Sequence, residues 1–276
     1  MSQIDNPLQL YKLLPKTNCR QCGVPTCMAF AAAVIKGEKR LDHCPHLERD
    51  TMERYDVRTS KRENIEQQQE KMIEQLKQKI AAVDFSLAAE RLGASLAGGK
   101  LTIKCLGRDF TVDAKGNVTS SCHINPWIMI PLLNYILIGA GKNVSGTWVP
   151  FRELTDGMTW NPLYEQRCEK PLKQIADQHP ELFEDLLYIF AGKPEKVGFV
   201  SDISITLHLL PKVPMLVCYC KPEDELESTL NIFFDSTVED HLNIESIYFL
   251  GAGLTVMFQK IALRHGYQPP VTLQQS

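Results

Sequence analysis

Residues 19–45 contain the stretch Cys19-Arg-Gln-Cys22-Gly-Val-Pro-Thr-Cys27, and a fourth cysteine follows in Cys44-Pro45. Three thiolates from one loop and a fourth from beyond a helix suit a 4Fe–4S cube, which needs one thiolate on each iron. Zinc also binds four cysteines, typically on two paired Cys-x2-Cys knuckles. The spacing therefore favours a 4Fe–4S cluster on Cys19, Cys22, Cys27 and Cys44, with a structural zinc ion as the alternative.

The residues around these cysteines agree with a cluster. Gly23 allows the backbone to come close enough for amide N–H groups to point at the sulfurs. The run Met28–Ile35 predicts a helix that Gly37 closes. Cys27 stands at the start of this helix, where the helix dipole stabilises negative charge.

Composition excludes several classes of protein. Nine cysteines are unevenly placed in 276 residues, with four between residues 19 and 44. A disulfide framework would spread them more evenly and would need an oxidising compartment. The net charge of −3 with both signs mixed indicates no basic face for nucleic acid. Hydrophobic residues make up 44% of the chain, which predicts a packed core.

The sequence contains no apolar run of roughly 18 residues or more, so we expect no membrane span. Met1–Gln9 has no basic region followed by an apolar region, so we expect no signal peptide. We therefore expect a cytoplasmic protein.

We expect three parts: a cluster domain over residues 1–50, a linker helix over residues 51–97, and an α+β domain over residues 98–276. Apolar residues between Ile65 and Leu87 recur at helical spacing, which predicts one long helix over residues 51–92. The favoured interpretation is a linker helix that lies on its neighbour. The alternative is a coiled-coil seam for dimerisation, although the stripe covers only about three heptads.

The larger part of the chain predicts strands, then helices, then strands, which indicates an α+β fold with antiparallel pairing. A β-meander is predicted over Leu101–Leu106, Asp109–Asp113 and Val118–Cys122. Helices are predicted over Pro126–Ile138, Glu169–Gln178, Pro180–Ala191 and about Asn243–His265. Further strands are predicted over Ile203–Leu210, Met215–Cys220 and Thr229–Asp235.

The cysteine-rich segment carries a family resemblance. Leu13-Leu-Pro-Lys-Thr-Asn-Cys-Arg-Gln-Cys-Gly-Val-Pro-Thr-Cys-Met-Ala-Phe-Ala, with Gly37-Glu38 and Cys44-Pro45, resembles the small cluster domain of the corrinoid iron–sulfur protein large subunit. A similar module occurs in membrane-linked ferredoxin oxidoreductases. The resemblance covers about residues 8–48. It implies that the four cysteines are the cluster ligands and that the module passes single low-potential electrons, in that family to the cobalt of a corrinoid.

The remainder resembles a different family. Thr147–Leu154, Asp202–Pro214 and Phe233–Asp235 are similar to an uncharacterised domain family often fused behind this cluster module. No (β/α)8 repeat follows residue 50. This second resemblance implies no established activity.

Other cysteines are weaker candidates. Cys218 and Cys220 would share one face of an apolar strand and could form half of a metal site or a redox pair, but small core residues are the favoured interpretation. Cys122-His123 could supply a metal or cobalt ligand. Cys105 and Cys168 have no obvious partners.

Two polar groupings are also candidates. Arg152 and Glu153 follow Trp148 and Phe151 and could bind a planar anion, although a structural ion pair is favoured. Asp224 and Glu225 could form an acidic site with Asp202 and Asp235, although ordinary turn chemistry is favoured. The sequence contains no P-loop, dinucleotide-binding glycine pattern or nucleophile elbow.

We therefore predict an electron-transfer protein. Its cluster would receive electrons from a ferredoxin-like donor and pass them to a cofactor or partner at the C-terminal domain, with a corrinoid or a corrinoid protein as the candidate. One alternative is a cluster-dependent redox enzyme or cofactor-binding protein with its own ligand in that domain. Another is a protein whose cluster only holds the fold together.

Overall fold

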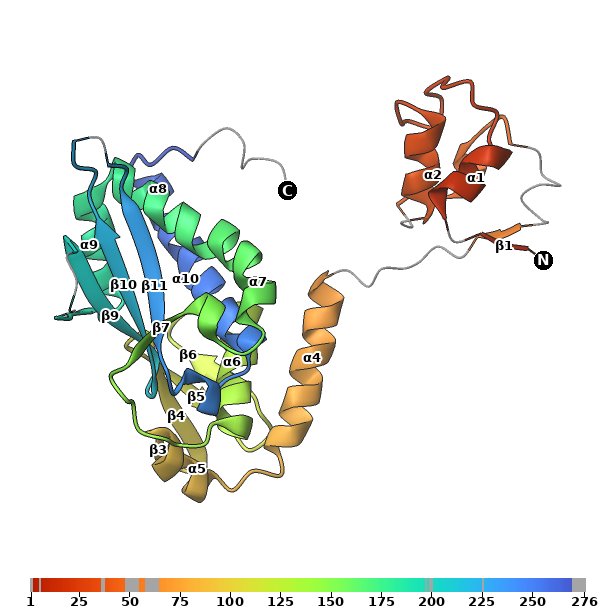
Figure 1. The fold of residues 1–276 in the computed structure, drawn as a ribbon. Coiled ribbons are helices and arrows are strands. Elements are labelled where there is room, and N and C mark those ends of the chain that lie inside the picture. The colour runs from red at the N-terminus through yellow and green to blue at the C-terminus, as the bar shows by residue number, and fades with distance from the viewer. Residues whose placement is uncertain are drawn as a thin grey trace. The chain divides into compact units, whose positions relative to one another are not determined.

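The computed structural model describes residues 2–4, 6–35, 38–47, 55–57, 65–196, 198, 201–224 and 226–269. The chain divides into two compact units, Met1–Gln69 and Glu70–Ser276, and each is described here by itself (Figure 1). The predicted domain limits at residues 50 and 97 stay a prediction.

The N-terminal unit is built on two short helices, α1 (Pro7–Leu13) and α2 (Cys27–Ile35). Asn6 begins α1, because its side chain accepts a hydrogen bond from Leu8 N–H and Pro7 follows it. The helices pack on a small apolar core with the turn η1 (Leu41–His43) nearby. Strands β1 (Ser2–Ile4) and β2 (Tyr55–Val57) pair in parallel.

The prediction of one helix over residues 51–92 is wrong. Residues 55–57 form β2, and two helices follow: α4 (Ile65–Ile80) and α5 (Phe85–Leu92). The break arises because the Asp84 side chain accepts hydrogen bonds from Ser86 N–H and Leu87 N–H and so begins a new helix. The predicted helical residues 51–54 and 58–64 lie outside the described residues.

The apolar stripe of this segment packs on the larger unit. Of its residues, Leu76 and Ile80 are buried in the core, and Met72, Ile73 and Val83 pack against it. Leu87, by contrast, is 69% exposed. The stripe therefore lies on its neighbour, as the linker interpretation predicts, and does not form a coiled-coil seam.

The predicted β-meander is confirmed, and the structure adds one strand to it. It comprises β3 (Ser95–Ala97), β4 (Lys100–Cys105), β5 (Arg108–Val112) and β6 (Val118–Ser120), paired in that order. β3 pairs with β4 across Gly98 and Gly99, whose φ values of +55° and +71° are those of a tight hairpin turn.

A second, five-stranded antiparallel sheet has the order β7-β11-β10-β9-β8. The predicted strands are confirmed as β9 (Ile203–Leu210), β10 (Val213–Cys220) and β11 (Thr229–Asp235). The edges are the short strands β7 (Trp148–Pro150) and β8 (Lys193–Pro194), which the sequence did not indicate.

Helices cover one face of this sheet (Figure 1). The predicted helices are confirmed as α6 (Pro126–Ile138), α8 (Lys170–Gln178), α9 (Pro180–Ile189) and α10 (Ile244–Arg264). Aromatic contacts join the layers, since Phe183 of α9 lies against both Tyr219 of β10 and Phe258 of α10. The unit is α+β, as predicted.

One stretch of helix was not predicted. α7 (Gly157–Tyr164) runs directly into a π-helical turn, η3 (Glu165–Glu169), and from there into α8. The short turns η2 (Phe151–Glu153) and η4 (Val238–Asp240) complete the unit.

α10 is long and apolar enough to cross a membrane by length and composition. However, 61% of its apolar window is buried inside the unit, where Leu254 and Phe258 belong to the core. α10 therefore packs as a core helix of the larger unit.

Candidate metal centre

The cysteine loop connects α1 to α2 and is tightly curled. Lys16, Asn18, Arg20 and Gly23 all have positive φ, between +49° and +79°. Three of these four residues are not glycine, so the curl is held by contacts rather than by backbone preference.

Asn18 supplies two of these contacts. Its Oδ1 accepts a hydrogen bond from Cys27 N–H at 2.8 Å and so satisfies the first N–H of α2, whereas Thr26 Oγ1 caps the helix by accepting from Ala29 N–H. Its own N–H donates to Cys27 Sγ at 3.4 Å. An amide N–H on a cysteine sulfur is an interaction that stabilises a thiolate and tunes an iron–sulfur cluster.

The fourth cysteine arrives on a separate segment. The η1 turn leads directly to Cys44, whose N–H donates to Leu41 O at 3.1 Å. Two residues later, a ring nitrogen of His46 lies 2.8 Å from Gln21 Oε1, between Cys19 and Cys22. This contact ties the Cys44 segment to the cysteine loop.

The four cysteines differ in how deeply they are buried. Cys27 and Cys44 are buried in the core of the N-terminal unit, and Cys22 packs against the same core. Cys19 is exposed. Three of the four predicted ligands therefore share one apolar environment, with the fourth at its surface.

Within the described residues, no three His, Cys, Asp or Glu side chains gather closely enough to hold one metal ion. A tetrahedral zinc ion needs four converging sulfurs, whereas the four thiolates of a 4Fe–4S cube each bind a different iron. The donor set and the N–H on Cys27 Sγ fit a cluster, and the assignment of the four ligands stays a prediction.

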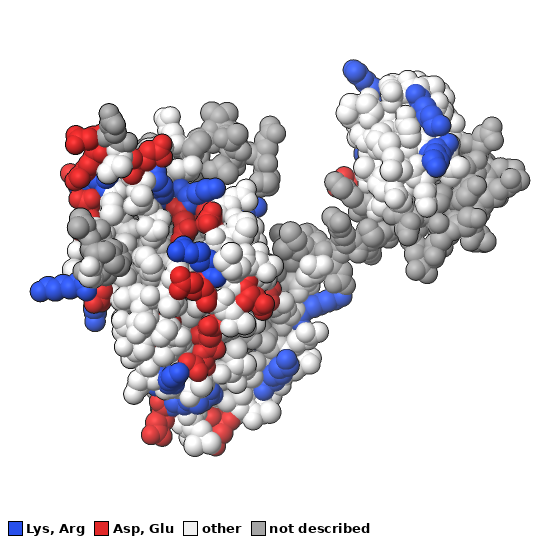
Figure 2. Space-filling model, in the orientation of Figure 1, with Lys and Arg blue, Asp and Glu red and all other residues white. Residues whose placement is uncertain are grey.

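Cations surround the cysteine loop. The described part of residues 6–47 contains Lys12, Lys16, Arg20, Lys39 and Arg40 but only two acidic residues. In Figure 2, this unit shows blue Lys and Arg side chains and little red. Lys39 Nζ lies 3.6 Å from the point where a side chain at Gly23 would begin, so one ammonium group stands directly over the loop. We call Lys16, Arg20 and Lys39 the basic rim.

The other cysteines lie in the larger unit, and three of them are core residues. Burial raises the pKa of Cys105 to about 12 and also raises the pKa values of Cys168 and Cys218. Cys218 is 2% exposed, and its Sγ lies 3.9 Å from Ser204 Oγ. These thiols are protonated at neutral pH, which supports the core interpretation of Cys218, while Cys220 is half-buried.

The remaining polar candidates do not assemble into a site. Cys122 is half-buried and His123 is exposed, and no described ligand-type residues complete a metal site with them. Arg152 and Glu153 are both exposed and form no ion pair with each other or with another described residue, so the favoured structural pair is wrong.

The acidic-site hypothesis is also wrong. Asp202 accepts a hydrogen bond from Lys221 N–H at the end of β10, and Asp224 occupies a turn with φ +48°. Asp235 ends β11, at the opposite end of a strand that is seven residues long. Glu225 lies outside the described residues.

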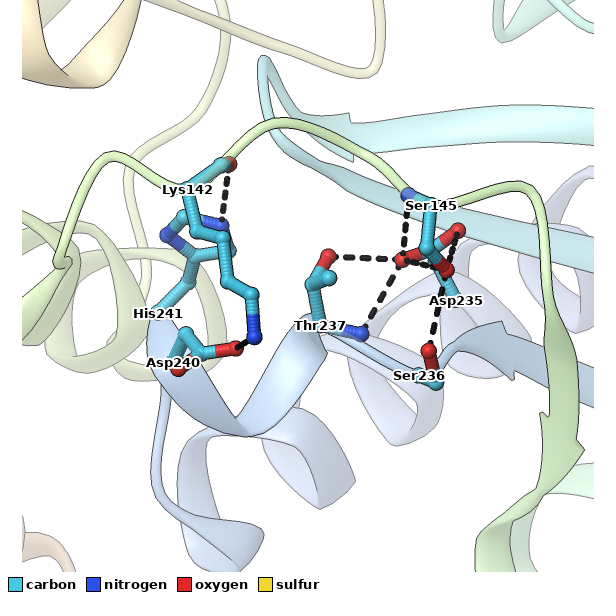
Figure 3. Close-up of polar contacts among 7 residues, drawn as sticks. All are labelled: Lys142, Ser145, Asp235, Ser236, Thr237, Asp240 and His241. Carbon is cyan, nitrogen blue, oxygen red and sulfur yellow. Dashed lines mark hydrogen bonds and ion pairs between the residues drawn. The ribbon is translucent and has the colours of Figure 1, made fainter.

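Asp235 instead anchors a loop (Figure 3). It is completely buried and accepts hydrogen bonds from the N–H groups of Ser145, Gly146 and Thr237 and from the hydroxyls of Ser145 and Thr237. These hydrogen bonds lower its pKa despite burial. Asp235 thereby fixes residues 139–147 against the end of the sheet.

His241, which no sequence signal indicated, belongs to the same anchor (Figure 3). Its ring is completely buried, and Nε2 lies 3.0 Å from Lys142 O. Because a carbonyl only accepts, Nε2 carries the proton and Nδ1 is left as an acceptor without a partner among the described residues. Burial lowers the pKa of His241.

Comparison with known proteins identifies the N-terminal module. The family model described as "Putative Fe-S cluster" matches residues 14–46. The acetyl-CoA decarbonylase/synthase complex subunit gamma of Methanocaldococcus jannaschii is 55% identical over 40 residues, which cover 14% of this chain and 8% of that protein. The corrinoid/iron-sulfur protein large subunit of Moorella thermoacetica is 52% identical over 40 residues, covering 14% and 9%. The chain thus spans less than a tenth of these relatives' lengths.

The larger unit has a family of its own. No solved structure matches the chain. The family model for a domain of unknown function, DUF3786, matches residues 84–257, which is more than half of the chain. The protein therefore belongs to the DUF3786 family, and it carries an N-terminal module similar to those of corrinoid iron–sulfur subunits.

Proposed function

We propose that this protein is an electron-transfer protein that holds a 4Fe–4S cluster on Cys19, Cys22, Cys27 and Cys44. The observation that carries the proposal is the pair of hydrogen bonds between Asn18 and Cys27, which aims an amide at the sulfur and satisfies the first N–H of α2 at the same residue. When bound, the cluster supplies one-electron redox chemistry.

Several groups of the module stabilise the negative charge of the thiolates. The N-terminus of α2 and the Asn18 N–H lie at Cys27, and Lys39 stands over Gly23. Each of these positive groups stabilises the more negatively charged, reduced state, so each raises the reduction potential. Cys19 is exposed, which gives an electron donor a route to the cluster. An exposed cluster ligand also suits a protein of an anaerobic cytoplasm.

We propose that the donor is a ferredoxin-like protein with an acidic face. The basic rim supports this, because complementary charge steers a donor toward the cluster and sets its orientation. The acceptor is a cofactor or partner at the larger unit, with a corrinoid as first candidate. The similarity to a corrinoid/iron-sulfur subunit supports that choice, and this similarity covers only the N-terminal module.

A second candidate is a redox enzyme or cofactor-binding protein whose larger unit holds its own ligand. A cavity of about 540 Å³ in that unit favours it. This volume falls in the range of about 300–1,000 Å³ typical of small-molecule sites.

The test is anaerobic addition of cob(II)alamin to the holoprotein after a reduced ferredoxin-like donor has reduced the cluster. Transfer of one electron to cobalt predicts loss of the cob(II)alamin visible spectrum and reoxidation of the cluster. The Cys27→Ser variant should not support the change, whereas Cys105→Ser should. A cluster that the donor reduces but that leaves every corrinoid state unchanged would remove the corrinoid acceptor. A cluster that no donor reduces reversibly would contradict electron transfer altogether.

A further inference from the structure

The cavity in the larger unit lies where its two sheets meet. Its walls come from the end of α5, strands β3 to β5, the segment after α9, and strands β8 and β9. Ala94, Ala191 and Pro211 give it an apolar side, and Lys104, Lys193 and His208 give it a basic side. None of the polar candidates discussed above lines it.

Backbone contacts fix the shape of this cavity. Leu106 N–H donates to His208 O at 3.1 Å and so joins the β4–β5 turn to β9. Gly107 in the same turn packs so closely on Ala191 that an added Cβ would lie 2.6 Å from the Ala191 Cβ. The cavity is therefore largely formed before any ligand arrives, as small-molecule sites usually are.

The charges in the cavity are not balanced. Lys104 Nζ lies 2.8 Å from Asp109 Oδ1, so these two groups neutralise each other. Lys193 has no ion-pair partner within the described part of the chain. Its ammonium group lies near His208, whose pKa is lowered by burial and by Lys193, while Glu195 acts in the opposite direction. One unpaired positive charge and one imidazole donor thus face the same space.

We propose that this cavity binds a small organic carboxylate, with its anionic group on Lys193 and His208 and its apolar body against Ala94, Ala191 and Pro211. A single unpaired ammonium suits a monoanion, because a charge-assisted hydrogen bond satisfies both groups. While His208 is neutral, a doubly charged phosphate would leave one charge without a partner in the cavity. The hydroxyls of Ser95 and Thr102 line the same space and add hydrogen-bonding groups.

Binding is coupled to protonation. A carboxylate next to His208 stabilises the imidazolium, so it raises the pKa that Lys193 and burial now lower. The other charged groups at the cavity are Glu195, which also favours the imidazolium, and the ion pair of Lys104 with Asp109. Affinity should therefore increase as the pH falls from about 8 to about 6.

The test is calorimetric titration of the full-length, cluster-loaded protein with benzoate, using benzamide as the uncharged isostere. We expect benzoate to bind at least about tenfold more tightly than benzamide, since the anion makes charge-assisted hydrogen bonds. Lys193→Met should weaken benzoate binding by about tenfold or more, and His208→Gln should abolish the increase in affinity at low pH. Lys100→Met, which removes an exposed lysine of β4 outside the cavity, should leave the Kd unchanged.

The proposal is overturned if benzoate does not bind, or binds no better than benzamide. It is also overturned if Lys193→Met binds benzoate as tightly as the unaltered protein. Lys193 and His208 are exposed, so their variants should fold, and a thermal melt checks this. None of these measurements depends on whether the cluster transfers electrons.

Discussion

Asn18 makes both of its hydrogen bonds to Cys27, one through its side chain and one through its backbone. Its positive φ of +49° also fits asparagine better than most residues, because asparagine tolerates the left-handed region.

Asn18→Ala should therefore weaken binding of the cluster. The change removes the acceptor of Cys27 N–H, an interaction worth about 1 kcal/mol, and places alanine at an unfavourable φ. We expect faster loss of iron to a chelator under anaerobic conditions, measured by the decay of cluster absorbance. Asn18→Asp keeps the acceptor and is the matched control. Equal loss rates in both variants and the unaltered protein would show that the hydrogen bond from Cys27 N–H to Asn18 does not support the site.

His241 predicts a pH dependence of stability. Its pKa is lowered in the folded state, so the unfolded chain binds a proton more readily as the pH falls. The contribution of neutral His241 is fully present above its unfolded pKa of about 6.5 and is lost as the pH falls below that value.

We expect the free energy of unfolding of the unaltered protein to fall between about pH 7.5 and pH 5.5, and His241→Gln to reduce this slope. Denaturant titrations at several pH values measure it. His208 contributes in the same direction, so the comparison rests on the difference between variants. Exposed His123→Gln serves as the control, and an identical slope in all three proteins would refute the role of His241.

At the scale of elements, residues 139–147 have no regular secondary structure but are held at several points. Asp235 accepts from Ser145, Gly146 and Thr237, and His241 contacts Lys142 O. Lys142 also pairs with Asp240 at 3.1 Å. The loop is thus a fixed part of the end of the sheet.

Asp235→Ala should lower the free energy of unfolding by about 3 kcal/mol or more, because several buried donors lose their acceptor. Asp185→Ala, at an exposed helical position of α9, should change it by less than about 0.5 kcal/mol. Chemical denaturation compares the two. Similar small effects would mean that Asp235 does not anchor the loop.

The sequence revealed most elements of the fold but few of their ends and junctions. Period-two and helical patterns located β9, β10, β11, α6 and α10 to within a few residues. The helix break at Asp84 was missed because a side-chain cap leaves the apolar spacing unchanged. The short strands β3, β7 and β8 were missed because two or three residues carry no pattern.

The candidate site likewise had features that the sequence revealed and features that it did not. The cysteine spacing is local and could be interpreted directly, and residues 14–46 match a family of cluster modules. The acidic residues were grouped wrongly, although the predicted strand Thr229–Asp235 already placed Asp235 at the opposite end of that strand from Asp224. His241 was missed because only tertiary packing buries it.

At the scale of the whole molecule, the basic rim predicts how the protein meets its donor. Charge reversal at Lys16 and Lys39 should slow cluster reduction by an acidic ferredoxin about tenfold at low salt, with a much smaller effect at high salt. Stopped-flow absorbance measures the rate. Reversal of Lys170 and Lys196, exposed lysines of the larger unit, is the matched control. Equal rates for both pairs would rule out steering by the rim.

The central claim is that Cys19, Cys22, Cys27 and Cys44 hold a redox-active 4Fe–4S cluster. The most direct measurement is metal analysis with EPR spectroscopy on protein reconstituted under anaerobic conditions, before and after reduction. The account predicts roughly four irons per chain and a low-potential EPR signal that appears on reduction, both lost in Cys27→Ser. Stoichiometric zinc without iron, or a signal that survives in Cys27→Ser, would contradict it.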